Sequence, residues 1–117
     1  MPMVKRIQLE MALIHGIVTM ALELGEGDGC PRGSSEVSDI VLSLLSQAGY
    51  RIDYVRGTRD GVDHGWFELA YPDRPFEYIV DLSALDSVAQ AVMSKASPEA
   101  GVYRSHTLGR LARRIGD

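Results

Sequence analysis

The chain has 117 residues, of which 45% are hydrophobic and 24% charged, and its formal net charge at pH 7 is −4. This composition lies near the average of globular domains and excludes a low-complexity or disordered chain. The length fits one domain, residues 1–117, and the acidic balance argues against general nucleic-acid binding.

Cys30 is the only cysteine, which excludes an internal disulfide, and we expect a cytoplasmic protein. Near the N-terminus two basic residues precede an apolar run, as in a secretory signal. Glu10 and His15 interrupt that run, and no small-residue cleavage pattern follows. The longest uncharged stretch, residues 11–22, is too short to cross a bilayer. We therefore expect neither a targeting segment nor a membrane span.

A first helix is predicted from about Met3 to Leu24, where apolar residues recur at three- and four-residue steps, and Gly25 is expected to end it. Further apolar residues widen the stripe, so the helix should be buried on more than one side. The next stretch, residues 25–33, is a glycine-rich loop. It is not a phosphate-binding loop, because no Gly-Lys-Ser/Thr follows.

The second helix has the clearest pattern, because apolar residues from Val37 to Ala48 follow a 3-4-3-4-3 spacing. Ser34 or Ser35 can cap its start, and Gly49 occupies the position expected for a left-handed C-terminal cap.

Three strands are predicted next, at residues 50–57, 62–71 and 76–82, separated by turns. Beyond Ser83 the pattern is helical as far as Val92, and a short basic helix is expected from about Thr107 to Ile115. The predicted fold class is therefore α+β, with the first two helices packed on a three-stranded antiparallel sheet and helices at the C-terminus.

The register of the last two strands brings a histidine to an aspartate. If residues 71–74 form a four-residue loop, Ala70 pairs with Pro75 and His64 lies directly opposite Asp81 on one face. A two-residue shift places the two side chains diagonally and is also allowed, because the first register sets two glutamates opposite each other. A one-residue slip would put them on opposite faces.

This order, a helix with a nucleophile candidate at its start, then a strand, a strand that opens with His64 and a strand that carries Asp81, resembles the transglutaminase-like branch of the papain-type cysteine enzymes. The segments AGYRIDYVRG, HGWFEL and YIVDLS carry the resemblance, which covers roughly residues 29–83. It implies a cysteine at the helix start, a histidine in a His-x-Trp-x-Glu-like strand and an aspartate on the neighbouring strand. A helix N-terminus stabilises a thiolate, an imidazole transfers the proton and a carboxylate fixes the tautomer.

The resemblance puts the nucleophile at Ser34, where the family has a cysteine. Ser34 then marks an inactivating substitution, a natural non-catalytic relative or a serine nucleophile, the last disfavoured by the high pKa of a hydroxyl. Alternatively the helix begins one turn earlier, with Pro31 at its first position, and Cys30 is the nucleophile. Ser35 is the nucleophile position if the phase of the helix is shifted by one residue.

The activity that the resemblance implies is thiol-dependent acyl transfer on a peptide or protein amide, by hydrolysis, deamidation or transamidation. The thiolate attacks the carbonyl, His64 protonates the departing amine and Asp81 orients His64. Trp66 and Ser35 are expected at the substrate site. No cofactor is expected, and the histidines and the cysteine match no metal-ligand spacing.

Two other functions compete with this one. The chain is alternatively a non-catalytic peptide- or protein-binding module that keeps the fold. A third hypothesis is a regulatory protein that binds nucleic acid through its basic C-terminal segment, with Arg110, Arg113 and Arg114.

Overall fold

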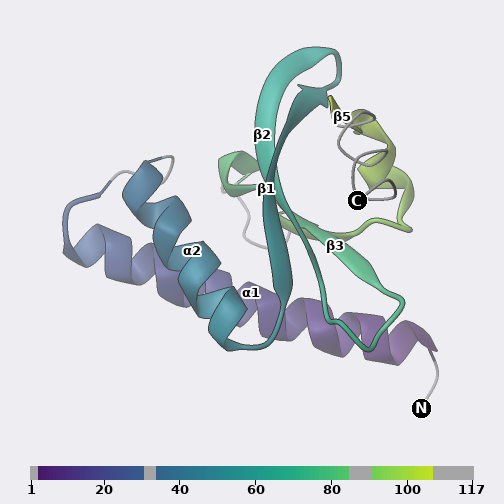
Figure 1. Ribbon diagram of the computed structural model, residues 1–117, viewed down its shortest axis with the longest axis horizontal. Helices are drawn as coiled ribbons and strands as arrows, with labels where there is room; N and C mark the ends of the chain where they lie inside the picture. Colours follow the sequence, from purple (N-terminus) through teal and green to yellow (C-terminus); the bar gives the residue numbers. More distant parts are fainter. Residues whose placement is uncertain (1–2, 31–33, 85–90, 107–117) are drawn as a thin grey trace, which may run out of the picture.

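Two helices lie on one face of a curled, five-stranded antiparallel sheet in the described part of the chain (Figure 1). The computed structural model describes residues 3–30, 34–84 and 91–106. The fold is therefore α+β, as predicted, but the sheet is larger than the three strands expected. The strand order is β4-β3-β2-β1-β5.

The first helix, α1 (Met3–Gly27), runs past Gly25, where the sequence pattern predicted its end. Gly25 is buried, and a Cβ atom there would lie 2.6 Å from Cγ2 of Val37, so this glycine allows α2 to approach α1. The helix instead ends before Gly29, which has a φ of +77°. Glycine suits this left-handed conformation.

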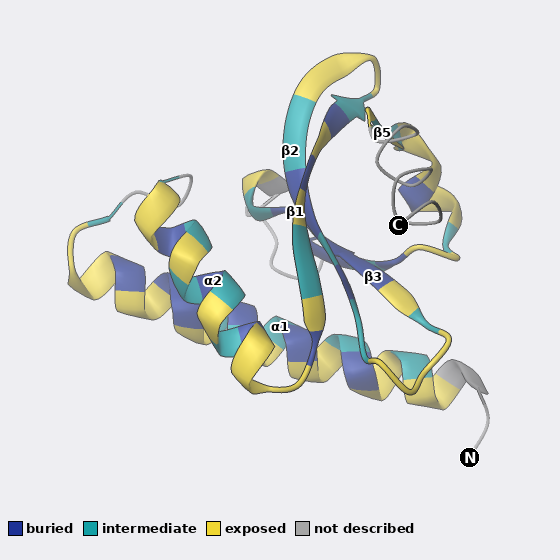
Figure 2. Ribbon diagram, in the orientation of Figure 1, coloured by how far each residue is buried: buried dark blue, intermediate teal, exposed yellow. Residues whose placement is uncertain are grey.

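By length and composition alone, residues 5–27 of α1 could cross a membrane. The core helix of a globular protein has the same profile. The inner face of α1 packs against α2 and the sheet, and Figure 2 shows its buried residues on that side. The fully buried members of this face are Ile14, Val18 and Ala21.

The second helix, α2 (Ser35–Gln47), agrees with its prediction. Ser34 is the N-cap, and its hydroxyl accepts a hydrogen bond of 3.3 Å from the backbone N–H of Val37. Gly49 follows the helix with a φ of +99°. The inner face of α2 buries Val37, Val41 and Leu45 in the same core as α1.

The three predicted strands form the middle of the sheet: β1 (Arg51–Arg59), β2 (Val62–Ala70) and β3 (Glu77–Val80). Asp60 and Gly61, both with positive φ, make the two-residue turn between β1 and β2. Such a turn matches the twist of a hairpin. Two short strands extend the sheet, β4 (Val92–Ser94) beside β3 and β5 (Tyr103–Ser105) beside β1.

The helix expected beyond Ser83 is wrong where it reaches Val92, because Val92 begins β4 and pairs with Val80. In the described part of the chain a short 3-10 helix, η1 (Leu82–Ala84), follows β3, and a second one, η2 (Pro98–Val102), precedes β5. Pairing with β3 outweighs the local helical pattern at this point. The rest of the expected helix, residues 85–90, and the basic helix at 107–115 lie outside the described residues.

The sheet buries side chains on both faces because it is curled. The face toward α1 and α2 carries Phe67, Leu69, Tyr78 and Val80, which belong to the larger core. The other face carries a smaller cluster closed by η2 and β5, whose buried members are Val55, Trp66, Ile79 and Ala100. Because side chains alternate along a strand, consecutive residues of β2 belong to different cores.

A buried carboxylate joins α1 to the sheet. Glu10 accepts hydrogen bonds from the hydroxyls of Tyr78, at 2.7 Å, and Tyr50, at 3.4 Å, and Arg74 donates to it at 2.8 Å. Burial and the negative charge of Glu10 raise the pKa of Tyr50 to about 12 and raise the pKa of Tyr78. Both tyrosines therefore remain neutral donors. In the sequence Glu10 is visible only as an interruption of an apolar run.

Gly57 of β1 allows β5 and the indole of Trp66 to pack closely. A Cβ atom at this position would collide with the backbone carbonyl of Arg104 and would lie 2.7 Å from Cη2 of Trp66. The curl of the sheet therefore depends on a residue without a side chain.

We predict that Gly57→Ala lowers the free energy of unfolding by about 1–3 kcal/mol, the usual cost of overpacking. Urea denaturation measures the change. Gly101→Ala is the matched control, because a Cβ atom there has no neighbour within 4 Å. Equal losses at the two positions would contradict the close packing at Gly57.

Candidate functional site

The centre of the candidate site is the carboxylate of Asp81, which directly follows β3 and has a side-chain exposure of 0%. One oxygen, Oδ2, accepts a 2.6 Å hydrogen bond from the hydroxyl of Tyr103. The other, Oδ1, accepts from the hydroxyl of Ser83 at 2.8 Å and from its backbone N–H at 3.0 Å. Nε2 of His64 lies 2.9 Å from Oδ1 and 3.0 Å from Oδ2. Arg59 adds a positive charge, 3.4 Å from Oδ2.

The predicted contact between His64 and Asp81 is present, in the second of the two registers allowed by the sequence. Ala70 pairs with Glu77, not with Pro75, so the connection between β2 and β3 is two residues longer than expected. Continued pairing sets Asp81 opposite Trp66, and His64 is its diagonal neighbour on the same face. The diagonal is within reach of an imidazole.

Tyr103 reaches Asp81 from the far side of the sheet because the sheet is curled. Tyr103 lies on the edge strand β5 and pairs with Arg59 of β1, whereas Asp81 follows β3. Its ring packs edge-on against Trp66, with ring centroids 5.1 Å apart, and its hydroxyl passes over the indole to the carboxylate. The site therefore joins the two sides of the curl.

Hydrogen bonding keeps Asp81 ionised in spite of its burial. Burial alone would raise the pKa of this carboxyl, but the hydrogen bonds from Tyr103, Ser83 and His64 together lower the pKa below its ordinary value. Burial and the adjacent carboxylate raise the pKa of Tyr103. The proton between these two groups therefore belongs to the tyrosine.

The arrangement around His64 fixes which ring nitrogen is basic. Both oxygens of the Asp81 carboxylate lie against Nε2, so the neutral imidazole carries its proton on Nε2 and its lone pair on Nδ1. The hydroxyl of Ser83 also lies against Nε2, at 3.1 Å. A serine triad needs the carboxylate and the nucleophile at different ring nitrogens. Ser83 is therefore a hydrogen-bond donor to the carboxylate and not a nucleophile paired with His64. Nδ1 is the ring nitrogen that can accept a proton.

The side chain of His64 is 21% exposed. Its ring stacks on Trp66, with a centroid separation of 6.2 Å, and borders a shallow cavity of about 270 Å³. The imidazole is thus both held in place and open to solvent.

The structure does not bring the predicted nucleophiles to His64. Cys30 is half-buried and packs against the larger core, and Ser34 uses its hydroxyl to cap α2. Ser35 is exposed at the first turn of α2. These residues belong to the helical layer, which lies on the side of the sheet away from β5 (Figure 1). His64 stacks on Trp66, a member of the smaller core that η2 and β5 close on the opposite face.

Trp66 was expected at the substrate site, but its exposure is 1% and it offers almost no surface to a ligand. It forms the floor beneath His64 and Tyr103. Its indole N–H donates a 3.0 Å hydrogen bond to Glu68, which Lys95 also contacts at 3.1 Å. Its position in the small core explains this burial.

Sequence reasoning missed three members of the site. Ser83 had a usable signal, because a serine two residues after an aspartate commonly forms a local turn with it. Arg59 could be placed only once Gly57 was known to pair with His64, because Arg59 is two residues from Gly57 and so lies on the same face of the sheet as His64. Tyr103 had no signal, since its contact depends on the curl of the sheet.

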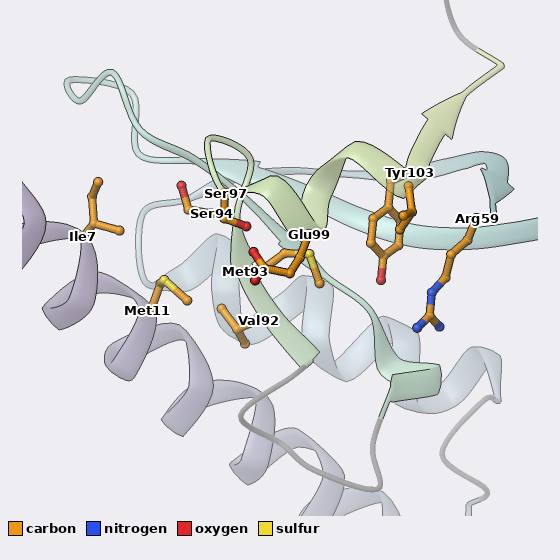
Figure 3. A pocket seen from close by; sticks show the side chains of 10 residues that line it. Ile7, Met11, Arg59, Val92, Met93, Ser94, Ser97, Glu99 and Tyr103 are labelled. Carbon is orange, nitrogen blue, oxygen red and sulfur yellow. The ribbon is translucent and has the colours of Figure 1, made fainter.

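A cavity of about 680 Å³ opens beside this cluster, between α1 and the segment from β4 to β5 (Figure 3). Arg59 and Tyr103 belong both to its wall and to the Asp81 cluster. Ser97 also belongs to the wall. The remaining wall residues are Ile7, Met11, Val92, Met93, Ser94, Glu99 and Val102.

Comparisons of the chain with protein-family models, with curated proteins and with solved structures give no match. Among residues 3–30, 34–84 and 91–106, no group of three or more histidine, cysteine and acidic side chains could hold a metal ion.

We predict that Asp81→Asn destabilises the fold by about 3 kcal/mol near pH 7, because it leaves four donors facing a neutral amide. A carboxylate whose pKa is lowered on folding contributes stability above its unfolded pKa, and this stability is lost as the pH falls through the folded pKa. The difference from wild type should therefore shrink as the pH falls below about 4. Urea denaturation between pH 3 and 7 measures it, with the exposed Asp63→Asn as control. A constant difference would mean that Asp81 does not titrate in this range.

The separation of Cys30 from His64 has a chemical consequence. We expect His64→Ala to change the rate of Cys30 alkylation by iodoacetamide by less than about twofold, because no imidazole activates the thiol. The same holds for Ser34→Cys in a Cys30→Ser background. If alkylation slows about tenfold in His64→Ala, in either background, the imidazole does activate the thiol, and the separation of the two groups is wrong.

Proposed function

We propose that the chain binds a peptide or protein segment across the Asp81 cluster and the adjoining cavity of about 680 Å³. The observation that carries this proposal is the juxtaposition of a largely apolar cavity with fixed polar groups. Tyr103 and Arg59 belong to both. A concave apolar site with a few convergent polar groups is the usual form of a ligand site.

The chemistry of the two parts suits a peptide. Methionine and valine side chains in the cavity wall accommodate an apolar side chain of variable shape. The side chain of Arg59 is 40% exposed, and its guanidinium can hydrogen-bond a backbone carbonyl or a carboxylate. The lone pair on Nδ1 of His64 is an acceptor for a backbone N–H.

The specific observation that favours binding without chemistry is the place of the nucleophile candidates. Cys30, Ser34 and Ser35 lie in the helical layer, on the other side of the sheet from His64. Among the alternatives given for Ser34, this placement favours a natural non-catalytic relative. A free thiol in the described chain also supports our proposal of a cytoplasmic location.

A second candidate function is acyl transfer on a peptide amide, favoured by the His64–Asp81 pair. With its proton directed to Asp81, His64 can accept a proton at Nδ1 from a nucleophile that attacks the carbonyl. The same nitrogen then returns that proton to the departing amine. The nucleophile in this reaction is a water molecule, so the products are an acid and an amine.

Selection from a random peptide library displayed on phage tests the proposal. We expect enriched peptides to share an apolar residue and to lose affinity by about tenfold or more in Val102→Glu, which places a charge in the cavity wall. Val102 is 37% exposed, so the fold should tolerate the change. Ser46→Glu adds the same charge to the exposed surface of α2 and is the matched control.

Mass spectrometry of the selected peptides after incubation with the protein separates the two functions. Peptides recovered unchanged indicate a binding module. Cleavage or deamidation that disappears in His64→Ala assigns acyl transfer to the site. Selection that enriches no peptide, or peptides whose binding ignores Val102→Glu, contradicts both functions at this cavity.

A further inference from the structure

The outer face of α1 exposes an apolar stripe that nothing in the described chain covers. Four large side chains form this outer stripe, and each is more than half exposed: Leu9 at 58%, Leu13 at 56%, Met20 at 51% and Leu24 at 51%. They recur at steps that keep them on one side of the helix, and the exposed Ala12 and Gly16 lie among them. Figure 2 shows the exposed side of α1 along the edge of the molecule, away from α2 and the sheet.

No close packing within the described chain requires a glycine at Gly16, in the middle of this stripe. A Cβ atom there would meet nothing within 4 Å. A glycine inside a helix costs about 1 kcal/mol relative to alanine. Small residues at the centre of an apolar helix face allow a second helix to approach closely.

The charges of α1 are arranged against its own dipole. Lys5 and Arg6 lie near the N-terminus, whereas Glu23 and Glu26 lie near the C-terminus. A helix favours anions at its N-terminus and cations at its C-terminus, so the dipole of α1 stabilises the charges at neither end. An antiparallel partner with the same sequence would set each basic end beside an acidic end.

The outer stripe has the symmetry that such a pairing needs. Leu9 and Leu24 are equally far along the chain from the Gly16–Ile17 bond, and so are Leu13 and Met20. A two-fold axis through this bond therefore sets Leu9 against Leu24 of the other copy and Leu13 against its Met20. Such an interface is self-complementary, as two-fold symmetry requires.

We propose that the outer stripe is the interface of a homodimer in which two copies of α1 pack antiparallel, with Gly16 at the crossing point. The contact runs along a helix of 25 residues, about 37 Å long. A membrane surface fits the charges less well, because membrane-surface helices are rich in basic residues whereas the C-terminal end of this one is acidic.

Sedimentation equilibrium of the full chain tests the proposal. We expect a mass twice that of the 12.8 kDa chain, and Leu13→Glu should weaken the dimer by about tenfold or more. Gln8→Glu adds the same charge to an exposed position of α1 beside the stripe and should leave the mass unchanged. Circular dichroism should show that both variants are folded, since both positions are exposed.

Disulfide cross-linking tests the orientation, in a Cys30→Ser background. Leu9→Cys and Leu24→Cys proteins should cross-link to each other when mixed, and neither to itself. Self-linked Leu9→Cys would show a parallel pair and overturn the proposal. A wild-type chain that stays monomeric at millimolar concentration would also overturn the proposal. If that monomer binds vesicles of phosphatidylcholine and phosphatidylglycerol through Leu13, the outer stripe contacts a membrane and not a second chain.

Discussion

The buried charge of Asp81 is the constraint on which the curled sheet and the candidate site both depend. A carboxylate without solvent is tolerated only when hydrogen bonds and opposite charges replace the lost water. Its partners come from β2, from η1 and from β5, so the charge is satisfied only when the edge strand β5 folds back over Trp66. Gly57 permits that approach, since any side chain there would occupy the space of the Arg104 carbonyl. Gly57 therefore leaves the space in which β5 approaches β1, and the indole of Trp66 packs there against Tyr103. The carboxylate of Asp81 then joins β5 to the end of β3 through its hydrogen bond with Tyr103.

Strand alternation then determines where chemistry can occur. Phe67 and Leu69 face the helices, so His64 and Trp66 must face the other way. The start of α2, where a nucleophile was predicted, is consequently separated from the imidazole by the sheet itself. The resemblance to papain-type enzymes rests on the order of residues along the chain. The side of the sheet on which the helices pack does not follow from that order. In this fold the start of α2 and the imidazole of His64 lie on opposite sides of the sheet.

Local patterns predicted the parts of the fold that depend on local interactions. The spacing of apolar residues gave α2 with its Ser34 cap, and turn residues with alternation gave the three central strands. Alternation also predicted that His64 and Asp81 share a face, although the loop after Ala70 is longer than the shortest one that fits. The remaining features are tertiary. Val92 has a helical pattern but pairs as a strand, Gly25 is a packing site within α1, and Tyr103 reaches Asp81 only through the curl.

The networks of the buried carboxylates Glu10 and Asp81 differ in their relation to the cavity of about 680 Å³. Glu10 is bound by two buried tyrosines and by Arg74, whose side chain is 40% exposed, and none of these residues lines the cavity. Asp81 is bound by His64, which is partly exposed, and by Tyr103, which lines the cavity, so its network extends to the cavity wall. The cavity uses the inner face of α1, at Ile7 and Met11, whereas the outer stripe lies on the opposite face of the same helix. Pairing of two chains through the stripe would therefore leave both copies of the proposed ligand site open, and a dimer of this kind would present two of the proposed peptide-binding surfaces.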